Sequence, residues 1–230
     1  MRAAGMPPTE RVETEIAMID LSGSWDRYWS ERSGGWRSNC RRNAKKLARQ
    51  GKVDYVRYRP LGAEAGDSDP RWDLYEQCER LAQRSWQGNS TTGTTISHET
   101  VRQFLRDVHA AAANSGCLDL NLLFVDDRAV AFNYNYAYHG YVSSLRLGFD
   151  PEFATYGPGT VLTHRMLEDS FERGDRTFDF LPGSLRVKRS WQTTLEAGRR
   201  YRYLPRGFSR LELLRAKEWF TDRGAVAQSS

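Results

Sequence analysis

A chain of 230 residues is long enough to bury the core of one folded domain, and its 39% hydrophobic and 12% aromatic content excludes a mainly disordered protein. It has no apolar run that would cross a bilayer and no leader with a basic start and an apolar core, so we expect a cytoplasmic protein. The formal charge of +5 is concentrated in residues 37–52 and 186–210 and would attract an anionic ligand, a nucleic acid or a membrane surface.

The three cysteines predict neither a disulfide framework nor a metal site. Cys40, Cys78 and Cys117 lie far apart, and the four histidines form no metal-ligand spacing. Cys40 and Cys78 fall on apolar faces of expected helices, where a cysteine acts as a small buried hydrophobe. We therefore expect reduced cysteines and no bound metal.

The first fifth of the chain predicts a loose start followed by a helix. Residues 1–18 carry prolines and charges without a clear period, which is typical of a loosely ordered lead-in. A helical pattern covers residues 24–50, with a break at residues 33–35, and Gly51 suits its end.

The middle of the chain predicts an α/β arrangement. The expected elements are a strand over residues 52–59, a helix over 69–85, a polar loop over 86–96, a helix from Ser97 to Gly116, and strands over 118–125, 129–138 and 141–148. The last three strands are joined by turns too short for anything but antiparallel hairpins.

The third hairpin strand leads into a crossover. It enters a loop with the sequence Tyr156-Gly157-Pro158-Gly159, which opens into a helix over residues 160–173 and then a strand over 177–181. Such a return pairs the second strand in parallel with the first. Glycines allow a ligand close to the main chain, and a helix start favours an anion, so we expect a phosphorylated cofactor here.

The remainder of the chain predicts a strand over residues 200–204, a helix over 209–221 and a flexible tail over 223–230. The glycine loop lacks the G-x-G-x-x-G spacing, and no G-K-[ST] follows it. These two absences disfavour nicotinamide dehydrogenases and P-loop nucleotidases.

Ordered stretches of sequence point to a known family. They are Arg37-Ser38-Asn39-Cys40-Arg41-Arg42, residues 148–152, the glycine loop at 156–159, residues 178–183, and Lys188 with Trp191. From Ile19 onward the chain resembles the GNAT-like acyltransferase domain of the cellulose or exopolysaccharide biosynthesis (CelD/BcsL) type. It is more distantly similar to Fem-type aminoacyltransferases.

The resemblance implies a GNAT-like α/β (α+β) fold, a mostly antiparallel mixed sheet flanked by helices with one parallel β-loop-α-β crossover. It implies one domain over residues 19–222, similar to the second half of a tandem GNAT protein, so that a dimer or a separate GNAT-like half are the expected partners. The implied reaction moves an acyl group from acyl-CoA to an amine or hydroxyl of a sugar, an amino compound or a cell-envelope or polysaccharide precursor.

Asp179 and Lys188 are the expected catalytic residues. Asp179 lies between Phe178 and Phe180, whose rings alternate to the other face of the strand, and a desolvated carboxylate there would act as a base. A pairing with an arginine or a loop cap is the alternative for Asp179. Lys188 would place a charge against a phosphate, a carboxylate or an oxyanion, or else is an ordinary solvated lysine.

The remaining site residues fall into two groups. The cofactor residues are expected to be Tyr156, Gly157, Gly159 and Thr160. The substrate residues are expected to be Arg41, Arg42, Lys45, Asn133, Asn135 and Trp191. The basic residues could equally form a solvated helix face, since charges near a helix C-terminus gain from the dipole without any ligand.

Two other functions remain open. A Fem-like enzyme would take its acyl group from aminoacyl-tRNA, with the basic helix binding RNA phosphates. A catalytically degenerate GNAT-like domain would only bind a ligand or partner in polysaccharide assembly. Ala154 favours this last reading, because the common GNAT signature has Arg or Gln three residues before the first loop glycine, and Pro158 removes one amide donor.

Overall fold

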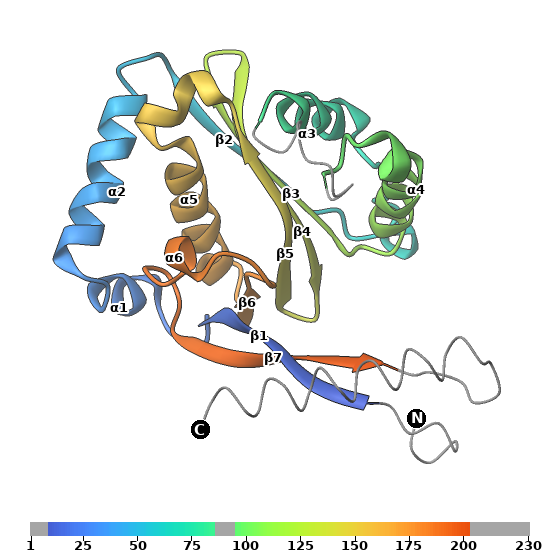
Figure 1. The fold of residues 1–230 in the computed structure, drawn as a ribbon. Helices are drawn as coiled ribbons and strands as arrows, with labels where there is room; N and C mark the ends of the chain where they lie inside the picture. Colours follow the sequence, from blue (N-terminus) through green and yellow to red (C-terminus); the bar gives the residue numbers. More distant parts are fainter. Residues whose placement is uncertain (1–8, 86–94, 203–230) are drawn as a thin grey trace. The chain divides into compact units, whose positions relative to one another are not determined.

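The structure is a computed structural model that describes residues 9–85 and 95–202 (Figure 1). These residues form a seven-stranded sheet in the order β2-β3-β4-β5-β6-β1-β7. The strands β2 to β5 pair in antiparallel succession, β5 and β6 pair in parallel, and β6 and β1 pair antiparallel. The expected fold class, a mixed and mostly antiparallel sheet flanked by helices with one parallel crossover, is confirmed.

The strands are β1 (Thr9–Asp20), β2 (Val53–Tyr58), β3 (Leu118–Val125), β4 (Arg128–Tyr138), β5 (Tyr141–Phe149), β6 (Thr177–Asp179) and β7 (Thr194–Arg202). The α-helices of the described ranges are α1 (Trp25–Ser30), α2 (Gly34–Leu47), α3 (Trp72–Arg84), α4 (Glu99–Asn114), α5 (Pro158–Glu172) and α6 (Leu185–Lys188). A 3-10 helix, η4 (Pro151–Tyr156), precedes α5.

Two serines start the first two helices. Ser24 Oγ accepts the N–H of Arg27, and Ser33 Oγ accepts the N–H of Trp36. Each bond satisfies an N–H that has no acceptor inside its helix. The helical pattern over residues 24–50 is therefore two helices, with the break at the predicted place.

The two faces of the sheet carry different cores. On the α3 face, covered by α3 and α4, alternate residues such as Leu120, Phe132 and Tyr134 pack against the two helices. On the opposite face, here called the α5 face, α2 and α5 lie beside the sheet (Figure 1). Leu47 of α2 and Val161 of α5 pack there on the strands. One strand serves both cores because successive side chains point to opposite faces.

Residues 9–18 correct the expectation of a loose lead-in, because they belong to β1. The strand pairs with β6 through Met18, Ile19 and Asp20, and Ala17 and Ile19 are buried in the core. The physical reason is an apolar run that begins at Ile16 and needs burial. Residues 1–8 lie outside the described residues.

The C-terminal predictions also need correction. β7 begins at Thr194, well before the predicted strand over 200–204. The strand predicted over 177–181 ends at Asp179, and Leu181 adopts a left-handed backbone with φ 54°. The helix predicted over 209–221 and the tail over 223–230 lie outside the described residues.

The chain divides into two units. Ile16–Glu196 form one unit, which contains every helix named above. In the other unit the described residues are 9–15 and 197–202, where Glu10 pairs with Arg199, and Glu13 with Arg200. No helix of the described ranges is long and apolar enough to cross a membrane.

Candidate active site

The predicted cofactor loop lies where η4 meets α5 (Figure 1). Tyr156 ends η4, Gly157 takes a left-handed backbone with φ 63°, and α5 begins at Pro158. Gly159 and Thr160 therefore belong to the first turn of α5, which starts two residues before the predicted boundary at 160. Pro158 suits this place because the first helical residue has no intrahelical use for an N–H.

The start of α5 has no side-chain cap. Ser24, Ser33 and His98 cap α1, α2 and α4 through their side chains, whereas the residue at this position of α5 is Gly157. Pro158 has no N–H, and the Thr160 N–H donates to the Gly157 carbonyl oxygen over 3.0 Å. The Gly159 N–H and the positive end of the helix dipole are thus left for an external acceptor. This geometry suits a phosphate group.

A close neighbour also restricts Gly157. A Cβ at Gly157 would lie 2.4 Å from Asn43 Nδ2, so α2 touches the loop directly. A Cβ at Gly159 would meet nothing nearer than Phe149 Cδ1, at 3.8 Å. The two loop glycines therefore differ. Only at position 157 do the left-handed backbone and the nearby Asn43 side chain both require a glycine.

β5 and β6 separate next to the candidate base. The parallel pairs are Tyr141 with Thr177, Val142 with Phe178, and Ser143 with Asp179. β6 ends at Asp179, while β5 continues to Phe149. The two strands thus part beside the candidate base, Asp179.

A β-bulge follows on β5. The partners on β4 step from Asn135 with Ser144 to Tyr134 with Arg146, so Leu145 is the extra residue. Leu145 packs into the core of the α3 face, and its neighbour Arg146 lies on the same face because it is opposite Tyr134. Regular alternation from Ser144 would have placed Arg146 on the α5 face.

Two hydrogen bonds hold the Asp179 carboxylate. Tyr141 Oη donates to Oδ2 over 2.8 Å, and the Leu181 N–H donates to Oδ1 over 2.6 Å. The second bond is the loop cap that was one of the two readings of Asp179. Burial, together with the bond to Asp179, raises the pKa of Tyr141 to about 12.

Asp179 faces the α3 side of the sheet. Its partner Ser143 is itself paired with Tyr136, whose side chain belongs to the α3 face. Phe178 and Phe180 are buried in the core on the other side, as alternation predicts. Asp179 as a residue is 7% exposed.

Lys188 lies against the loop that follows Asp179. Its Nζ donates to the carbonyl oxygens of Phe180 and Leu181, over 2.9 and 2.6 Å. A Cβ at Gly183 would come within 3.0 Å of the same Nζ. Burial lowers the pKa of Lys188, against the opposing effect of Asp179. Lys188 therefore holds the backbone that carries the candidate base.

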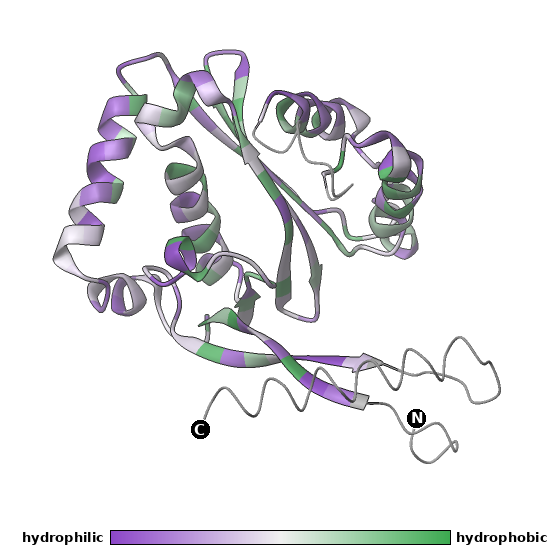
Figure 2. Ribbon diagram, in the orientation of Figure 1, coloured by the Kyte–Doolittle hydropathy of each residue, from purple (hydrophilic) through white to green (hydrophobic). Residues whose placement is uncertain are grey.

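The basic residues of α2 are exposed. Arg41, Arg42 and Lys45 lie on its surface, and much of the helix is hydrophilic (Figure 2). Arg42 Nη2 donates to Asn39 Oδ1 over 2.7 Å. The structure places Arg41 and Arg42 at the open surface, in keeping with the solvated-face reading.

Lys45 lines a cavity of about 620 Å³ between α2, β2 and α5, together with Lys52 and Arg165. Lys52 pairs with Asp54 over 2.9 Å, and Arg165 pairs with Glu168 over 3.5 Å. In the part of the chain that the structure describes, Lys45 has no ion pair. The cavity therefore offers one unpaired cation beside α5.

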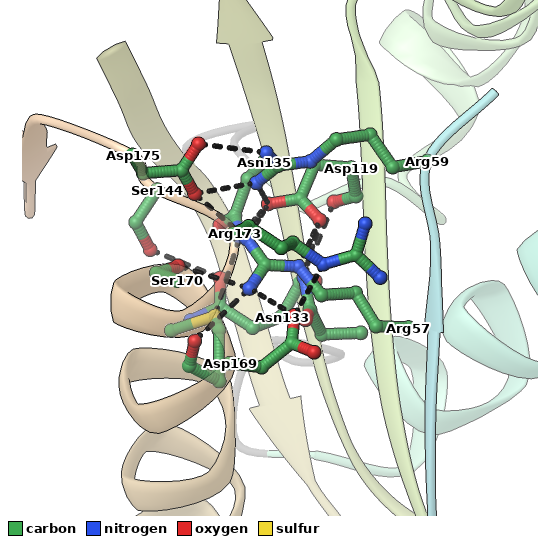
Figure 3. Close-up of polar contacts among 12 residues, drawn as sticks. Arg57, Arg59, Asp119, Asn133, Asn135, Ser144, Asp169, Ser170, Arg173 and Asp175 are labelled. Carbon is green, nitrogen blue, oxygen red and sulfur yellow. Dashed lines mark hydrogen bonds and ion pairs between the residues drawn. The ribbon is translucent and has the colours of Figure 1, made fainter. Parts of the chain in front are cut away.

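Asn133 and Asn135 lie in a buried polar network (Figure 3). Asn135 Nδ2 donates to Asp119 Oδ2 over 3.0 Å, and Asn133 Oδ1 accepts from Ser144 Oγ over 2.9 Å. The two asparagines are 2% and 0% exposed, in that order. Both side chains are therefore buried and bonded within the protein, and their expected role in substrate binding stays a prediction.

The centre of this network is an ion pair between Arg57 and Asp119 (Figure 3). Arg57 Nε and Nη2 donate to the two carboxylate oxygens of Asp119, over 2.8 and 2.9 Å, and the side chains are 2% and 0% exposed. Arg57 Nη1 donates to Asp169 Oδ2 and Ser170 Oγ on α5, over 2.8 and 2.9 Å. The network thus ties α5 to β2 and β3.

Trp191 is a core residue. It is 2% exposed, with Trp29 stacked at a ring-centroid distance of 6.1 Å and Trp36 edge-on at 5.1 Å. Its carbonyl oxygen accepts from Tyr28 Oη over 2.6 Å. Trp191 thus packs against α1 and α2, and its expected contact with substrate stays a prediction.

Sequence reasoning missed two residues near Asp179. The parallel crossover pairs β5 with β6, so the register, once known, would have brought Tyr141 to Asp179. The position of Arg146 depends on the bulge, for which the sequence carries no turn residue or glycine as a signal. Within the described ranges, no group of three or more His, Cys, Asp or Glu side chains is arranged to hold a metal ion.

Comparison with solved structures shows the same fold in three bacterial proteins. A conserved protein of unknown function from Bacteroides thetaiotaomicron has a TM-score of 0.52 at 15% identity, with 89% of this chain and 67% of that chain covered. The L-PGS from Bacillus licheniformis has 0.51 at 14% identity, covering 85% and 60%. The C-terminal domain (DUF2156) of a proposed lysylphosphatidylglycerol synthetase from Agrobacterium fabrum has 0.50 at 12% identity, covering 88% and 61%.

These likenesses concern the fold alone, and the chain spans about three fifths of the length of the last two proteins. No curated protein matches the sequence. The model of the acetyltransferase (GNAT) domain matches residues 35–189, which include α2, the β3–β5 meander, the loop before α5, Asp179 and Lys188. The chain belongs to the acetyltransferase (GNAT) domain family.

Proposed function

We propose that this protein transfers an acyl group from acyl-CoA to an amine or hydroxyl of a sugar, an amino compound or a cell-envelope or polysaccharide precursor. The proposal follows the CelD/BcsL-type resemblance within the GNAT family. It includes a cytoplasmic location, one GNAT-like domain over residues 19–222, and a second copy or a separate GNAT-like half as partner.

One observation carries the proposal. The uncapped start of α5 lies at the end of β5, and β5 leaves β6 beside Asp179. An anion site and a candidate base are thus joined by a single strand. The residues present fit acyl-CoA in this respect, with Gly157, Gly159 and Thr160 at the phosphates and Tyr156 beside them.

The chain's own groups have distinct roles in this proposal. Acyl-CoA, when bound, supplies an acyl group activated as a thioester. Asp179 accepts the proton that the acceptor's amine or hydroxyl loses as it attacks the acyl carbon, and the proton can pass from Asp179 to the CoA sulfur, which leaves as the acyl–sulfur bond breaks. Tyr141 orients the carboxylate through its hydrogen bond, and Lys188 acts as a positioning residue through the carbonyls of Phe180 and Leu181.

The test is CoA binding followed by turnover. Acetyl-CoA or a longer acyl-CoA should raise the melting temperature, and Gly159→Trp should abolish that rise. The matched control is Gly23→Trp, since a Cβ at Gly23 meets nothing within 4 Å. Asp179→Asn should keep the CoA-induced rise but lose turnover by about 10²- to 10⁴-fold. If no CoA thioester changes the melting temperature of the wild-type protein, the proposal is wrong.

A second candidate is a Fem-like transfer from aminoacyl-tRNA, favoured by the exposed cations of α2. RNA held by Arg41, Arg42 and Lys45 would dissociate steeply as salt rises, because bound phosphates release counterions. Filter binding of tRNA at two salt concentrations tests the Fem-like function. If tRNA does not bind, or binds independently of salt, this function is rejected. Turnover of any CoA thioester would in turn reject a degenerate, purely ligand-binding domain.

A further inference from the structure

Arg146 carries a charge that no acid neutralises in residues 9–85 and 95–202. Its Nη1 donates to the Leu145 carbonyl over 2.7 Å, and its Nε is buried without a hydrogen-bond partner. Burial lowers the pKa of Arg146, whereas the acids around Arg57 and Arg59 raise theirs. A partly buried cation without a counter-charge lowers the stability of the fold. A ligand that brings a negative charge to Arg146 would remove this destabilisation when it binds.

The ionisable group whose charge would act on the pKa of Arg146 is the Tyr136 phenol. Burial raises the pKa of Tyr136, so this phenol is neutral at physiological pH and leaves the guanidinium uncompensated. The Tyr75 hydroxyl on the same face is also buried without a hydrogen-bond partner. The α3 face therefore holds an unpaired cation among neutral hydroxyls.

Arg146 and Asp179 share this face of the sheet on neighbouring strands. Asp179 is level with Ser143, and Arg146 is two regular steps beyond Ser143 because Leu145 is the bulge residue. That offset is about 7 Å along β5. Tyr141, which donates to Asp179, is 40% exposed, so this end of the face is open to solvent.

We propose that Arg146 binds an anionic group, a carboxylate or a phosphate, of the acceptor whose amine or hydroxyl is deprotonated at Asp179. A guanidinium can offer a planar fork of donors to either group. The bulge at Leu145 is what turns that fork onto the face of the candidate base. This inference rests on the proposed acyltransferase function and names the chemical class of its acceptor.

The first arm of the test measures the anion site without turnover. Inorganic phosphate and succinate are titrated separately into the full-length protein, and the Nε–H resonance of Arg146, identified by its loss in Arg146→Gln, is followed by NMR. Saturable shifts with phosphate alone indicate a phosphate-bearing acceptor, and shifts with succinate alone indicate a carboxylate. No shift with either anion overturns the inference.

Calorimetry with the same two anions compares variants. Arg146→Gln should weaken binding by about tenfold or more, while Arg146→Lys should lose less because it keeps the charge but not the fork. The control Arg80→Gln, which removes a half-exposed arginine of α3, should bind as wild type does. Equal affinity in Arg146→Gln and wild type, with unchanged melting temperatures, also overturns the inference.

The second arm separates this inference from the proposed function. Acetyl-CoA should raise the melting temperature of Arg146→Gln as much as that of wild type. Turnover is then compared within two matched pairs of acceptors, glucosamine 6-phosphate with glucosamine and 4-aminobutyrate with butylamine. In each pair, Arg146→Gln should lower the turnover of the acceptor that carries the anionic group and leave that of the analogue without it unchanged. If CoA fails to bind although anions shift Arg146, the proposed function and the acceptor role fall. If CoA binds but no anion does, the Arg146 inference alone falls.

Discussion

Gly157 and Gly159 stand two residues apart, and the structure makes opposite demands on them. Gly157 combines a φ of 63° with a neighbour that would lie 2.4 Å from its Cβ, whereas Gly159 is helical and has free space around it. A sequence pattern that treats both as one glycine loop hides this difference. Substitution separates the two roles.

Gly157→Ala should lower the free energy of unfolding by about 1–3 kcal/mol, because an L-residue resists the left-handed region and its methyl group meets Asn43. Adding Asn43→Ala should recover the steric part and leave the backbone part. The control Gly159→Ala should stay neutral or gain up to about 1 kcal/mol in a helix. Denaturant unfolding followed by circular dichroism gives the values, and equal losses at the two glycines would contradict this account.

Within the described ranges, the helix α5 contacts two other helices and four strands. Its start forms the candidate cofactor loop, and its second half is tied to the sheet by Arg57. Arg57 also donates to the Met166 carbonyl oxygen inside α5, over 3.0 Å. The buried network therefore fixes the height and tilt at which α5 presents its N-terminal amides.

Arg57→Met should cost about 3–5 kcal/mol in unfolding free energy, because it leaves the fully buried Asp119 short of its main counter-charge. The control Arg27→Met removes an exposed pair with Glu31 and should cost at most about 1 kcal/mol. The double variant Arg57→Met/Asp119→Leu should regain part of the loss. Urea unfolding monitored by tryptophan fluorescence checks all three, and a loss for Arg57→Met no larger than for Arg27→Met would rule out the clamp.

Local pattern was enough to predict the meander, the glycine loop and the parallel crossover, because alternation, short turns and a helix start are all read from neighbouring residues. The network was not predictable in this way. Arg57 and Asp119 are each unremarkable charges in a strand, and only the pairing of β2 with β3 brings them together. The same holds for Asn133 and Asn135, whose polarity suggested a substrate contact and whose side chains bond within this network.

At the scale of the whole molecule, two desolvated histidines and one buried carboxylate make the free energy of unfolding depend on pH in two separate ranges. Burial lowers the pKa values of His109 and His164 to about 4 from an ordinary 6.5. For His164 burial outweighs the Glu168 carboxylate, 3.9 Å away. Asp119 has its pKa lowered instead by Arg57 and Arg59, against the opposing effect of burial.

Stability should therefore fall in two stages on acidification. Between pH 6.5 and 4 the unfolded chain takes up protons that the folded histidines refuse, so unfolding free energy declines by at most about 1.4 kcal/mol per pH unit for each. Partial solvent access to the His164 ring reduces its contribution to this slope. Below about pH 4 the stability from Asp119 is lost in turn, since its carboxylate is favoured only in the folded state.

His164→Phe provides the check. The ring sits edge-on to Trp25 and Trp29, so phenylalanine preserves the aromatic packing. Unfolding free energies measured from pH 7 to 3 should show a shallower slope above pH 4 in this variant and an unchanged slope below it. An identical slope above pH 4 would mean that His164 titrates alike in the folded and unfolded chain.

The bulge on β5 has one more consequence. Arg146 lies on the face of Tyr134 because β5 accommodates one extra residue in a bulge. Deleting Leu145 would restore one-to-one pairing and leave Arg146 opposite Tyr134, whereas pairing Leu145 in regular alternation would turn Arg146 to the opposite face, toward Asn133 and Ser144. In a domain built this way, loss of the bulge without loss of any residue would move the anion-binding side chain away from the candidate base, and a comparison of matched side chains would not reveal the change.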